Sequence, residues 1–450
     1  MIDIKLLRQD PQRFIDGAKA KGIEANIPAL LEADRRLLDA RRELQELRTV
    51  QNAANRKIAK LSGKEKADAI AEMKQAKDRA KALEDAIAEL EPRFEELTLQ
   101  VPLPPDPAVP LGASSEDNVE IRRWNPRWFD TSRSFEDNKG FAPRTHIELG
   151  ESLGMLDIPR GVKMSGSRSY VLWGRLMQLH QAVLRLAFDY MVNEQGFTPV
   201  CVPVLVRPGV LVGTGFFPFY KDQVYEIRET DRGASQDLYL TGTGEAGLMG
   251  LHQDDILDGA TLPRRYVTIS TCFRREAGAA GKDTAGVFRI HQFDKVEQVV
   301  LCQANVEEGR TWHAKMIGFV EELMQRLELP YRLVQCCTAD LGPKNADMID
   351  IETWMPSRGQ EGPDGRAMGA YGETHSASRL DDYQCRRLNL RYREPQGGRI
   401  AFCHSLNNTV IASPRILIPI MELYQNADGS VTVPQALRPY MNGLEKIEPA

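Results

Sequence analysis

The sequence lacks the signals of several protein classes. No run of about 18 apolar residues could form a membrane span, and the opening MIDIKLLRQDPQRF lacks the apolar core of a signal peptide. The seven cysteines form no CxxC pair and share no repeated spacing, which argues against both a disulfide framework and a zinc site. These absences predict a cytoplasmic protein with reduced thiols, no zinc and no membrane partner.

The chain also lacks an excess of positive charge. Its 58 Lys and Arg residues face 63 Asp and Glu residues, which gives a formal net charge of −5. The protein as a whole therefore does not attract nucleic acid, and any such contact must be local. A length of 450 residues is too great for one average domain and predicts two or three.

The first hundred residues are poor in glycine and rich in Ala, Leu, Glu, Lys and Arg. Two segments repeat apolar residues at alternating spacings of three and four, which is typical of the seam of a coiled coil. A turn is expected at residues 61–64 with Gly63 as the helix C-cap, and Pro92 should bend the second helix without breaking the contact. The pattern predicts an antiparallel helical hairpin. Its seam consists of Leu30, Ala33, Leu37, Ala40, Leu44, Leu47, Gln51, Ala54, Ile58 and Leu61 in the first helix, and Ala69, Met73, Ala76, Ala80, Leu83, Ile87, Leu90, Phe94, Leu97 and Val101 in the second.

A proline-rich stretch, VPLPPDPAVPLG, follows at residues 101–112. Proline removes a backbone donor and fixes φ, so this stretch cannot be helical and is expected to be a hinge. Beyond it the pattern changes to short strands, helices and glycine turns. The chain therefore divides into a helical arm at residues 1–103 and a larger domain at residues 113–450, and its fold class is α+β.

Residues 272–300, CFRREAGAAGKDTAGVFRIHQFDKVEQVV, indicate two strands joined by a glycine-rich, charged loop. Arg274 and Glu276 fall on the first expected strand, and Arg289, Phe293 and Glu297 on the second. A guanidinium group can clamp a phosphate, an aromatic face can cover a base and a carboxylate can hold an ammonium group. The combination favours nucleotide binding over an ordinary hairpin with surface ion pairs.

The wording FRREAGAAGKDTAG…HQFDKVE resembles motif 2 of the class II aminoacyl-tRNA synthetases, and specifically that of the seryl-tRNA synthetase family. A helix around residues 176–193 and a strand ending at Pro203 resemble motif 1, which forms the dimer interface in class II enzymes. LNNTVIASPRILIPIMELYQ at residues 406–425 resembles motif 3. The resemblance implies a homodimer, a catalytic domain built on an antiparallel β-sheet flanked by helices, and a tRNA-binding role for the arm. From its own sequence, the arm could equally be a dimerising coiled coil or a spacer.

The resemblance also implies a serine pocket. Thr243 and Glu245, in LTGTGEAG, are two residues apart and are expected to share one face of a strand. Glu245 and Glu297 would bind the substrate ammonium, and Arg274 would hold its carboxylate together with the α-phosphate of ATP. Thr409 is the leading candidate to recognise the serine hydroxyl, because a polar partner left unpaired makes a wrong substrate costly. The implied serine site thus comprises Thr243, Glu245, Arg274, Glu297, Asn407 and Thr409.

ATP would lie over motif 2. The implied ATP site comprises Arg274, Glu276, Arg289, the Ile290 backbone, Phe293, Glu373, Ser376 and Arg415. In the segment GETHSASR, Glu373 and Ser376 would hold Mg²⁺ that bridges two phosphates. This segment departs from the common family wording, because His375, Ala377 and Arg379 replace serine, cysteine and asparagine. The residues implied to act in catalysis are Arg274, Glu297 and Arg415.

The implied activity is that of an AMP-forming serine–tRNA ligase. It would make seryl-adenylate from L-serine and ATP and transfer serine to the 3′ end of tRNA(Ser), with tRNA(Sec) as a second candidate acceptor. One alternative is a paralogue that adenylates an amino acid for a carrier protein or a small-molecule pathway, which would not need the arm. The other is an inactive coiled-coil binding protein, which the intact Arg274, Glu297, Glu373 and Arg415 argue against.

Overall fold

The computed structural model describes residues 1–58, 62–229, 237–277, 283, 285–362 and 367–448. The chain forms two compact units, Met1–Pro104 and Pro105–Ala450. No helix within the described residues is both long and apolar enough to cross a membrane. The described cysteines, which are all seven in the chain, are free.

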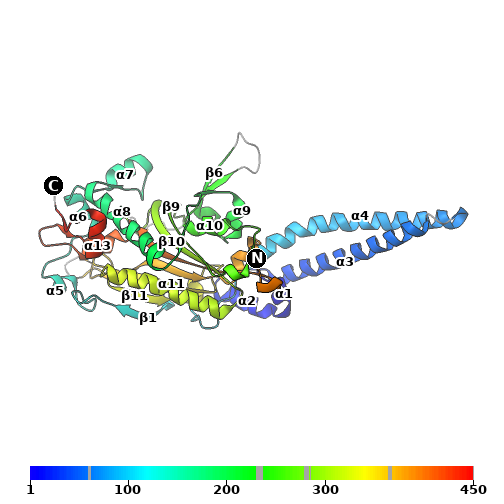
Figure 1. Cartoon of the computed structure of the whole chain (residues 1–450), viewed down its shortest axis with the longest axis horizontal. Helices are drawn as coiled ribbons and strands as arrows, with labels where there is room; N and C mark the ends of the chain where they lie inside the picture. Colours follow the sequence, from blue (N-terminus) through cyan, green and yellow to red (C-terminus); the bar gives the residue numbers. More distant parts are fainter. Residues whose placement is uncertain (59–61, 230–236, 278–282, 284, 363–366, 449–450) are drawn as a thin grey trace. The chain divides into compact units, whose positions relative to one another are not determined.

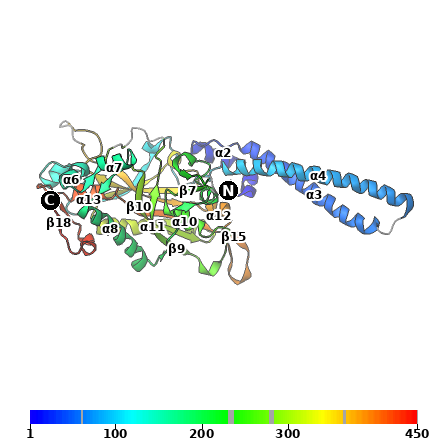
Figure 2. The same ribbon diagram turned by 90° about the horizontal axis from the view of Figure 1, so that it is seen from above.

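The first unit consists of helices. They are α1 (Ile4–Gln9), α2 (Pro11–Ala20), α3 (Ile27–Ile58) and α4 (Gly63–Leu99). The two long helices α3 and α4 lie side by side in both views (Figures 1 and 2). At about 1.5 Å per residue, the 32 residues of α3 span roughly 48 Å.

Ion pairs across the hairpin fix its direction. Arg41 pairs with Glu91 at 2.6 Å, and Arg48, one heptad further along α3, pairs with Glu84 at 2.7 Å. As residue numbers rise in α3 they fall in α4, so the helices are antiparallel. Leu83 is buried in the seam with Ala40, Leu44 and Ala80. The predicted helical hairpin is confirmed.

The expected C-cap at Gly63 is wrong, whereas Pro92 leaves the second helix unbroken, as expected. Gly63 does not end the first helix but begins α4, with Ser62 as its N-cap. Pro92 lies inside α4, which continues through it to Leu99. Of the expected turn and seam, Leu61 lies outside the described residues, as does the side chain of Ile58.

The second unit is built on an eight-stranded sheet with the order β1-β11-β12-β13-β16-β10-β9-β4. Every neighbouring pair is antiparallel except β4 and β9, which are parallel. The predicted antiparallel sheet is therefore confirmed. Its strands are β1 (Val119–Trp124), β11 (Tyr331–Gln335), β12 (Asp347–Met355), β13 (Ala370–Arg379), β16 (His404–Ser413), β10 (Gln292–Cys302), β9 (Arg264–Phe273) and β4 (Thr198–Pro199).

The two faces of this sheet have different roles. Helices α8 (Gly174–Asp189) and α11 (Val306–Arg326) pack against one face (Figure 1). On that face, Gln298 of β10 and Asn408 of β16 both donate to the carbonyl of Met316 in α11, at 3.2 and 3.0 Å. The next residue, Glu297, points to the opposite face, because side chains alternate along a strand. There it lies beside Gly244, the first residue of α10 (Gly244–Gly250).

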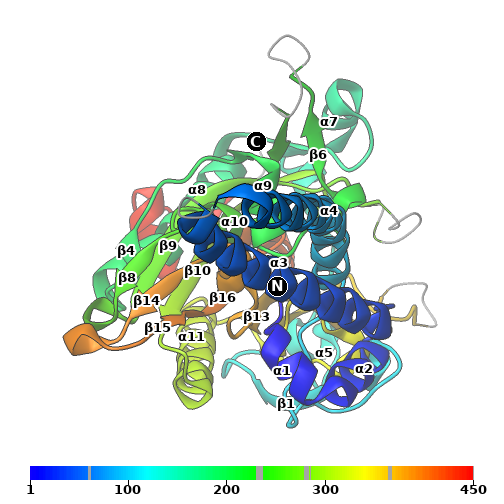
Figure 3. The ribbon, with the colours of Figure 1, turned by 90° about the vertical axis from the view of Figure 1, so that its right-hand side faces the viewer.

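Smaller elements surround the large sheet. Strand β8 (Ile256–Asp258) pairs with β14 (Arg391–Arg393), which pairs with β15 (Ile400–Phe402), and these three lie together in Figure 3. The other helices are α5 (Phe135–Lys139), α6 (His146–Ser152), α7 (Ile158–Ser165), α9 (Pro208–Gly213), α12 (Tyr383–Arg387) and α13 (Leu417–Leu423). The other strands are β2 (Leu156–Asp157), β3 (Val171–Leu172), β5 (Leu205–Val206), β6 (Tyr225–Ile227), β7 (Leu238–Leu240), β17 (Val431–Thr432) and β18 (Lys446–Ile447).

The expected motif 1 helix is present, but the strand that follows it is shorter than expected. Helix α8 ends at Asp189 and is followed by a π-helical turn at Tyr190–Glu194. The expected strand to Pro203 is reduced to β4, which ends at Pro199. The backbone N–H of Val200, the next residue, still donates to the carbonyl of Val267 in β9 at 2.9 Å.

The proline-rich stretch at residues 101–112 contains neither helix nor strand, as predicted. It is nevertheless fixed at Asp106, which is buried and forms ion pairs with Arg310 and Arg379. From Asp106 onward the chain is therefore anchored to the second unit and is not a free hinge.

Lys21, directly after α2, generates a prediction about pH. Burial lowers the pKa of Lys21 to about 7, whereas an unfolded lysine titrates near 10.4. Between these values the unfolded chain binds the extra proton, so stability should rise with pH. We expect the unfolding free energy of fragment 1–104 to increase between pH 7 and 9 by up to about 1.4 kcal/mol per pH unit. Urea unfolding of this fragment would measure it. Lys21→Met should make the unfolding free energy less dependent on pH. An equally steep dependence in that variant would mean that Lys21 is not its source.

Candidate active site

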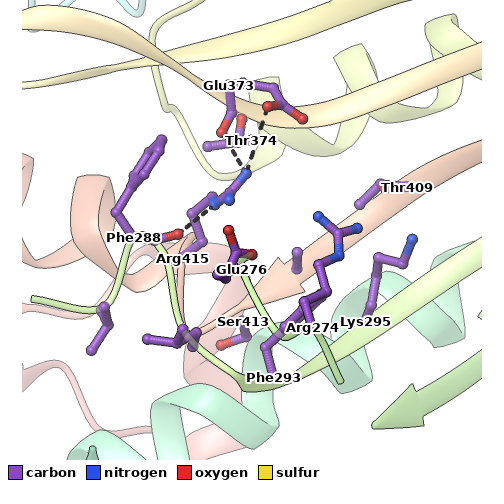
Figure 4. Close-up of a pocket in the computed structure, with 13 residues that line it drawn as sticks. Arg274, Glu276, Phe288, Phe293, Lys295, Glu373, Thr374, Thr409, Ser413 and Arg415 are labelled. Atoms are coloured by element: carbon purple, nitrogen blue, oxygen red, sulfur yellow. Dashed lines mark hydrogen bonds and ion pairs between the residues drawn. The ribbon is translucent and has the colours of Figure 1, made fainter. Parts of the chain in front are cut away.

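A pocket lies on the face of the sheet opposite α11. Its walls come from β10, β13, β16 and the segment that joins β9 to β10. Figure 4 shows Arg274, Lys295 and Thr409 together on one side, and Phe288, Glu373 and Arg415 on the other. Seven of the thirteen predicted site residues line it: Arg274, Glu276, Ile290, Phe293, Glu373, Thr409 and Arg415.

The first arginine of this pocket does not lie on a strand as expected. Strand β9 ends at Phe273, and Arg274 continues the pairing only by donating its backbone N–H to the carbonyl of His291 at 2.9 Å. Its guanidinium lies 5.2 Å from the ring of Phe293. A planar cation over an aromatic ring is favourable. Arg274 is thus held at the pocket mouth next to the aromatic face predicted to stack on a base.

Glu276 and Arg289 also lie outside the strands to which they were assigned. Glu276 has a φ of 51°, in the left-handed region, and β10 begins only at Gln292. The chain therefore leaves the ladder earlier than its β-like pattern suggests, because the glycine-rich segment turns away. The two side chains still meet, since Arg289 donates to Glu276 at 3.2 Å. Arg289 does not line the pocket with Glu373 and lies at an adjoining one.

Phe288, which the sequence did not single out, lies between two guanidinium groups. Arg358 approaches its ring to 3.9 Å and Arg415 to 4.4 Å. Arg415 also donates to the carbonyls of Phe288 and Glu373, each at 3.0 Å. Burial lowers the pKa of Arg415, and the nearby Glu373 carboxylate opposes this shift. These contacts hold a cation at the far wall of the pocket.

The pair Thr243 and Glu245 is not on a strand, so this expectation was wrong. Thr243 is the N-cap of α10, and its hydroxyl accepts from the backbone N–H of Glu245 at 3.2 Å. A hydroxyl residue followed by an acidic residue in the first turn is the ordinary start of a helix. That signal was present in TGTGEAG and could have been used.

Glu245 is almost fully buried, with 4% of its surface exposed, and it accepts hydrogen bonds from three side chains. Lys344 Nζ contacts its two carboxylate oxygens at 2.7 and 2.8 Å. Gln384 Nε2 and Asn407 Nδ2 each donate to Oε1 at 2.7 Å. The donors come from the segment before β12, from α12 and from β16, so one carboxylate joins three parts of the fold.

Glu297 is the second buried carboxylate. It forms an ion pair with Lys295, whose ammonium also donates to the Thr243 hydroxyl at 2.7 Å. Burial raises the pKa of Glu297, while the Lys295 cation opposes the rise and the Glu245 carboxylate adds to it. The two carboxylates therefore belong to one electrostatic cluster, which we call the buried charge cluster: Glu245, Glu297, Lys295 and Lys344.

Neither lysine of this cluster was predicted from the sequence as a site residue. Lys295 stands two residues before Glu297 on β10, and the period of a strand places both on one face, so a signal existed. Lys344 reaches Glu245 across 99 positions of sequence, and Gln384 does so across 139. Nothing local in the sequence marks such contacts.

The proposed metal ligands lie on β13, at a bulge. Ile351 pairs with His375 but Glu352 pairs with Glu373, so Thr374 is an extra residue. Glu373 lines the pocket with a half-exposed carboxylate, whereas Ser376 does not line it. Burial and the Arg415 cation lower the pKa of His375, between them, to about 3, so it adds no positive charge at neutral pH. A carboxylate and a hydroxyl are hard oxygen donors, a set that suits Mg²⁺.

Two sequence models of known families match the chain. Residues 1–105 match the seryl-tRNA synthetase N-terminal domain. Residues 225–424 match the tRNA synthetase class II core domain (G, H, P, S and T).

Similar proteins extend over the full chain. A serine–tRNA ligase of Deinococcus radiodurans is 40% identical over 446 residues, covering 99% of this chain and 98% of that protein. One of Thermomicrobium roseum is 38% identical, covering 99% and 95%. Among solved structures, seryl-tRNA synthetase of Pyrococcus horikoshii complexed with ATP is 36% identical with a TM-score of 0.87, and covers all of both chains. Cytoplasmic serine–tRNA ligase of Naegleria fowleri in complex with AMP is 28% identical with a TM-score of 0.84, covering 100% of this chain and 99% of that one.

The buried charge cluster generates a prediction about stability. Lys295→Met leaves Glu297 without its cation, and breaking a buried pair in this way costs about 3–5 kcal/mol. The loss should shrink as pH falls from 7 to 5, because Glu297 can then take up a proton in the folded state.

Urea unfolding of the wild type, Lys295→Met and Lys295→Met/Glu297→Gln measures this effect. The double variant should recover most of the loss, since it buries no unpaired charge. A double variant as unstable as the single one would mean that Lys295 acts through packing and not through its charge.

Proposed function

This chain belongs to the seryl-tRNA synthetase family, and we propose how its residues carry out the reaction of that family. It is a serine–tRNA ligase, which joins L-serine to tRNA in an ATP-dependent, AMP-forming reaction. The acceptor that we propose is tRNA(Ser), with tRNA(Sec) as a second candidate. The observation that carries the residue assignment is that Arg274 lines one pocket together with Phe293 and with Lys295 of the buried charge cluster.

Serine binds beside the buried charge cluster. Its ammonium group is held by Glu245 and Glu297, and its carboxylate by Arg274. Thr243 is part of the same site, because its hydroxyl accepts a hydrogen bond from Lys295. Thr409 of β16 is the strand partner of Glu297 of β10. The side chain of Thr409 lines the pocket, which supports its role at the serine hydroxyl. Asn407 donates to Glu245 and so holds this carboxylate in place.

ATP occupies the remainder of the pocket. Its adenine stacks on Phe293, next to the Ile290 backbone and Glu276, while Arg289 and Arg415 contact the phosphates. A serine carboxylate oxygen attacks the α-phosphorus in line, and pyrophosphate leaves from the opposite side. Arg274 touches both reactants, so it aligns them and stabilises the charge that develops on the α-phosphoryl oxygens.

Class II synthetases of this kind use a divalent metal, and we assign it here to Mg²⁺ at Glu373 and Ser376. When bound, the ion would neutralise phosphate charge. Glu373 faces the pocket with a half-exposed carboxylate, which supports this assignment. The carbonyl of Glu373 accepts from Arg415, so the strand segment that carries this carboxylate is fixed beside a phosphate-binding cation. We expect no zinc.

The helical hairpin at residues 1–103 is assigned to tRNA binding, and residues 113–450 to catalysis. An arm whose helix α3 spans roughly 48 Å is long enough to follow a nucleic-acid backbone. The family match at residues 1–105 supports this assignment. A carrier-loading paralogue would have no use for such an arm, which favours tRNA as the acceptor.

A homodimer and a cytoplasmic location complete the proposal. Around the expected motif 1, an apolar groove is lined by Val202, Leu205 and Leu251, and the two leucines are 42% and 51% exposed. An apolar surface of this kind supports a subunit interface. The cytoplasmic assignment rests on the sequence alone.

Arg274→Ala tests the catalytic assignment. Removing one charge-assisted donor from the developing phosphoryl charge should slow serine-dependent pyrophosphate exchange by roughly 100- to 1000-fold. Arg275→Ala is the matched control, because this neighbouring arginine lines neither pocket around Arg274. If Arg274→Ala exchanged pyrophosphate as fast as Arg275→Ala, the assignment would be wrong.

Deletion of the hairpin tests its role. The antiparallel helices begin and end at the same end of the hairpin, so residues 30–101 can be replaced by a short glycine-serine linker. The shortened protein should exchange pyrophosphate normally but charge tRNA more slowly by about two orders of magnitude or more, since backbone contacts are lost. Equal charging with and without the hairpin would exclude tRNA binding by residues 30–101. Loss of exchange as well would show that the hairpin is structural.

A further inference from the structure

We propose that Lys344 occupies the place of the substrate ammonium group on Glu245, so that serine must displace it in order to bind. The inference rests on the proposed role of Glu245 in the serine site. It makes Lys344 a residue that sets the affinity of the enzyme for the α-ammonium group of an amino acid.

The contact itself is the first argument. Lys344 presents a primary ammonium group, the same chemical group as the amino end of serine, and it bridges both Glu245 oxygens at 2.7 and 2.8 Å. With Gln384 and Asn407 also bonded to Oε1, the carboxylate makes four contacts with donors. A carboxylate offers about four lone-pair positions. Oε1 accepts from all three side chains, whereas the contact at Oε2 comes from Lys344. Another ammonium group can therefore bridge both oxygens of Glu245 only if Lys344 leaves.

Lys344 is the donor best able to leave. Gln384 is fully buried and is also bonded to the Thr214 carbonyl at 2.9 Å and to the Ser405 hydroxyl at 3.0 Å. Asn407 is part of β16 and is paired with neighbours on both sides of that strand. Lys344 instead lies in the segment between a turn at Thr338–Asp340 and β12, and its side chain is 13% exposed. A lysine also has a long, flexible stem.

Lys344 has a second contact that does not depend on Glu245. In its present position Nζ already lies 4.6 Å from the centre of the Phe216 ring, whose face attracts a cation. Phe216 lines the pocket that adjoins Arg274, together with Tyr220 and Gly242. A Lys344 ammonium group displaced from Glu245 can therefore keep its contact with this ring.

The charge balance of the cluster favours exchange of one ammonium group for another over addition of a third. The buried charge cluster contains two carboxylates and two ammonium groups, so it is neutral as it stands. Adding the ammonium group of serine without losing that of Lys344 would leave an excess positive charge in a region shielded from water, which is unfavourable. Replacing one ammonium by another leaves the charge of the cluster unchanged. The enzyme without Lys344 on Glu245 is then the state that binds serine, and the population of that state scales the apparent affinity.

Two substitutions of Lys344 should change the affinity for serine in opposite directions. Lys344→Met keeps the length of the side chain and removes the competing ammonium, so the KM for serine in pyrophosphate exchange should fall by about tenfold. Lys344→Arg places a guanidinium against the same carboxylate, and its two-pronged bonding should make displacement harder and raise this KM. The KM for ATP should remain near wild type in both variants. Without serine, Lys344→Met should be less stable than wild type, because Glu245 then lacks its cation. Lys315→Met is the matched control, because Lys315 lies 4.7 Å from the ring of Trp312, on α11 and away from the site.

A higher KM for serine in Lys344→Met would overturn the proposal, because it would mean that Lys344 supports Glu245 and does not compete for it. Thermal melting with and without serine adds a second measurement, in which serine should stabilise Lys344→Met more than wild type. If Lys344→Met fails to fold, Lys344→Arg decides, and an unchanged or lower KM for serine then refutes the proposal. Absence of serine-dependent exchange in the wild type would instead contradict the activity itself.

Discussion

Two carboxylates buried side by side constrain the whole catalytic unit. Glu245 and Glu297 are 4% and 1% exposed, and like charges so far from water are tolerated only with cations beside them. Lys295 and Lys344 supply these cations, while Gln384 and Asn407 complete the bonding of Glu245. Five parts of the chain, namely α10, β10, the segment before β12, α12 and β16, must therefore be in place before the site exists.

The sheet makes this arrangement possible because its two faces are kept apart. Gln298 and Asn408 bind the carbonyl of Met316 on the helical side, while Glu297, one position away, points into the site. The strands β10 and β16 are thus fixed from behind by α11. The cations at the front, Arg274 and Arg415, are held by backbone contacts at the edge of the nucleotide pocket. A rigid central sheet with charges presented from several strands suits a reaction that requires mostly positioning.

The sequence predicted what depends on periodicity and motif wording. The hairpin followed from the spacing of residues such as Leu37 and Leu83, and the pocket residues from the segment around Arg274. Element boundaries were less predictable. Thr243 caps a helix where a strand was expected. A threonine and a glutamate two residues apart can share one face of a strand or start a helix, and only the capping preference of threonine distinguishes the two. The role of Lys344 could not be predicted, because it depends on a contact with Glu245, which is 99 residues away in the sequence.

The central claim is that this pocket recognises serine through its ammonium, carboxylate and hydroxyl groups together. Pyrophosphate exchange with the full chain, measured in parallel with serine, alanine, glycine and threonine, tests it most directly. Alanine retains the ammonium and carboxylate and lacks only the hydroxyl, so the buried polar partners of that hydroxyl would remain unpaired. The account predicts that kcat/KM for serine exceeds that for alanine by roughly 100-fold or more. Exchange with alanine as efficient as with serine would contradict it.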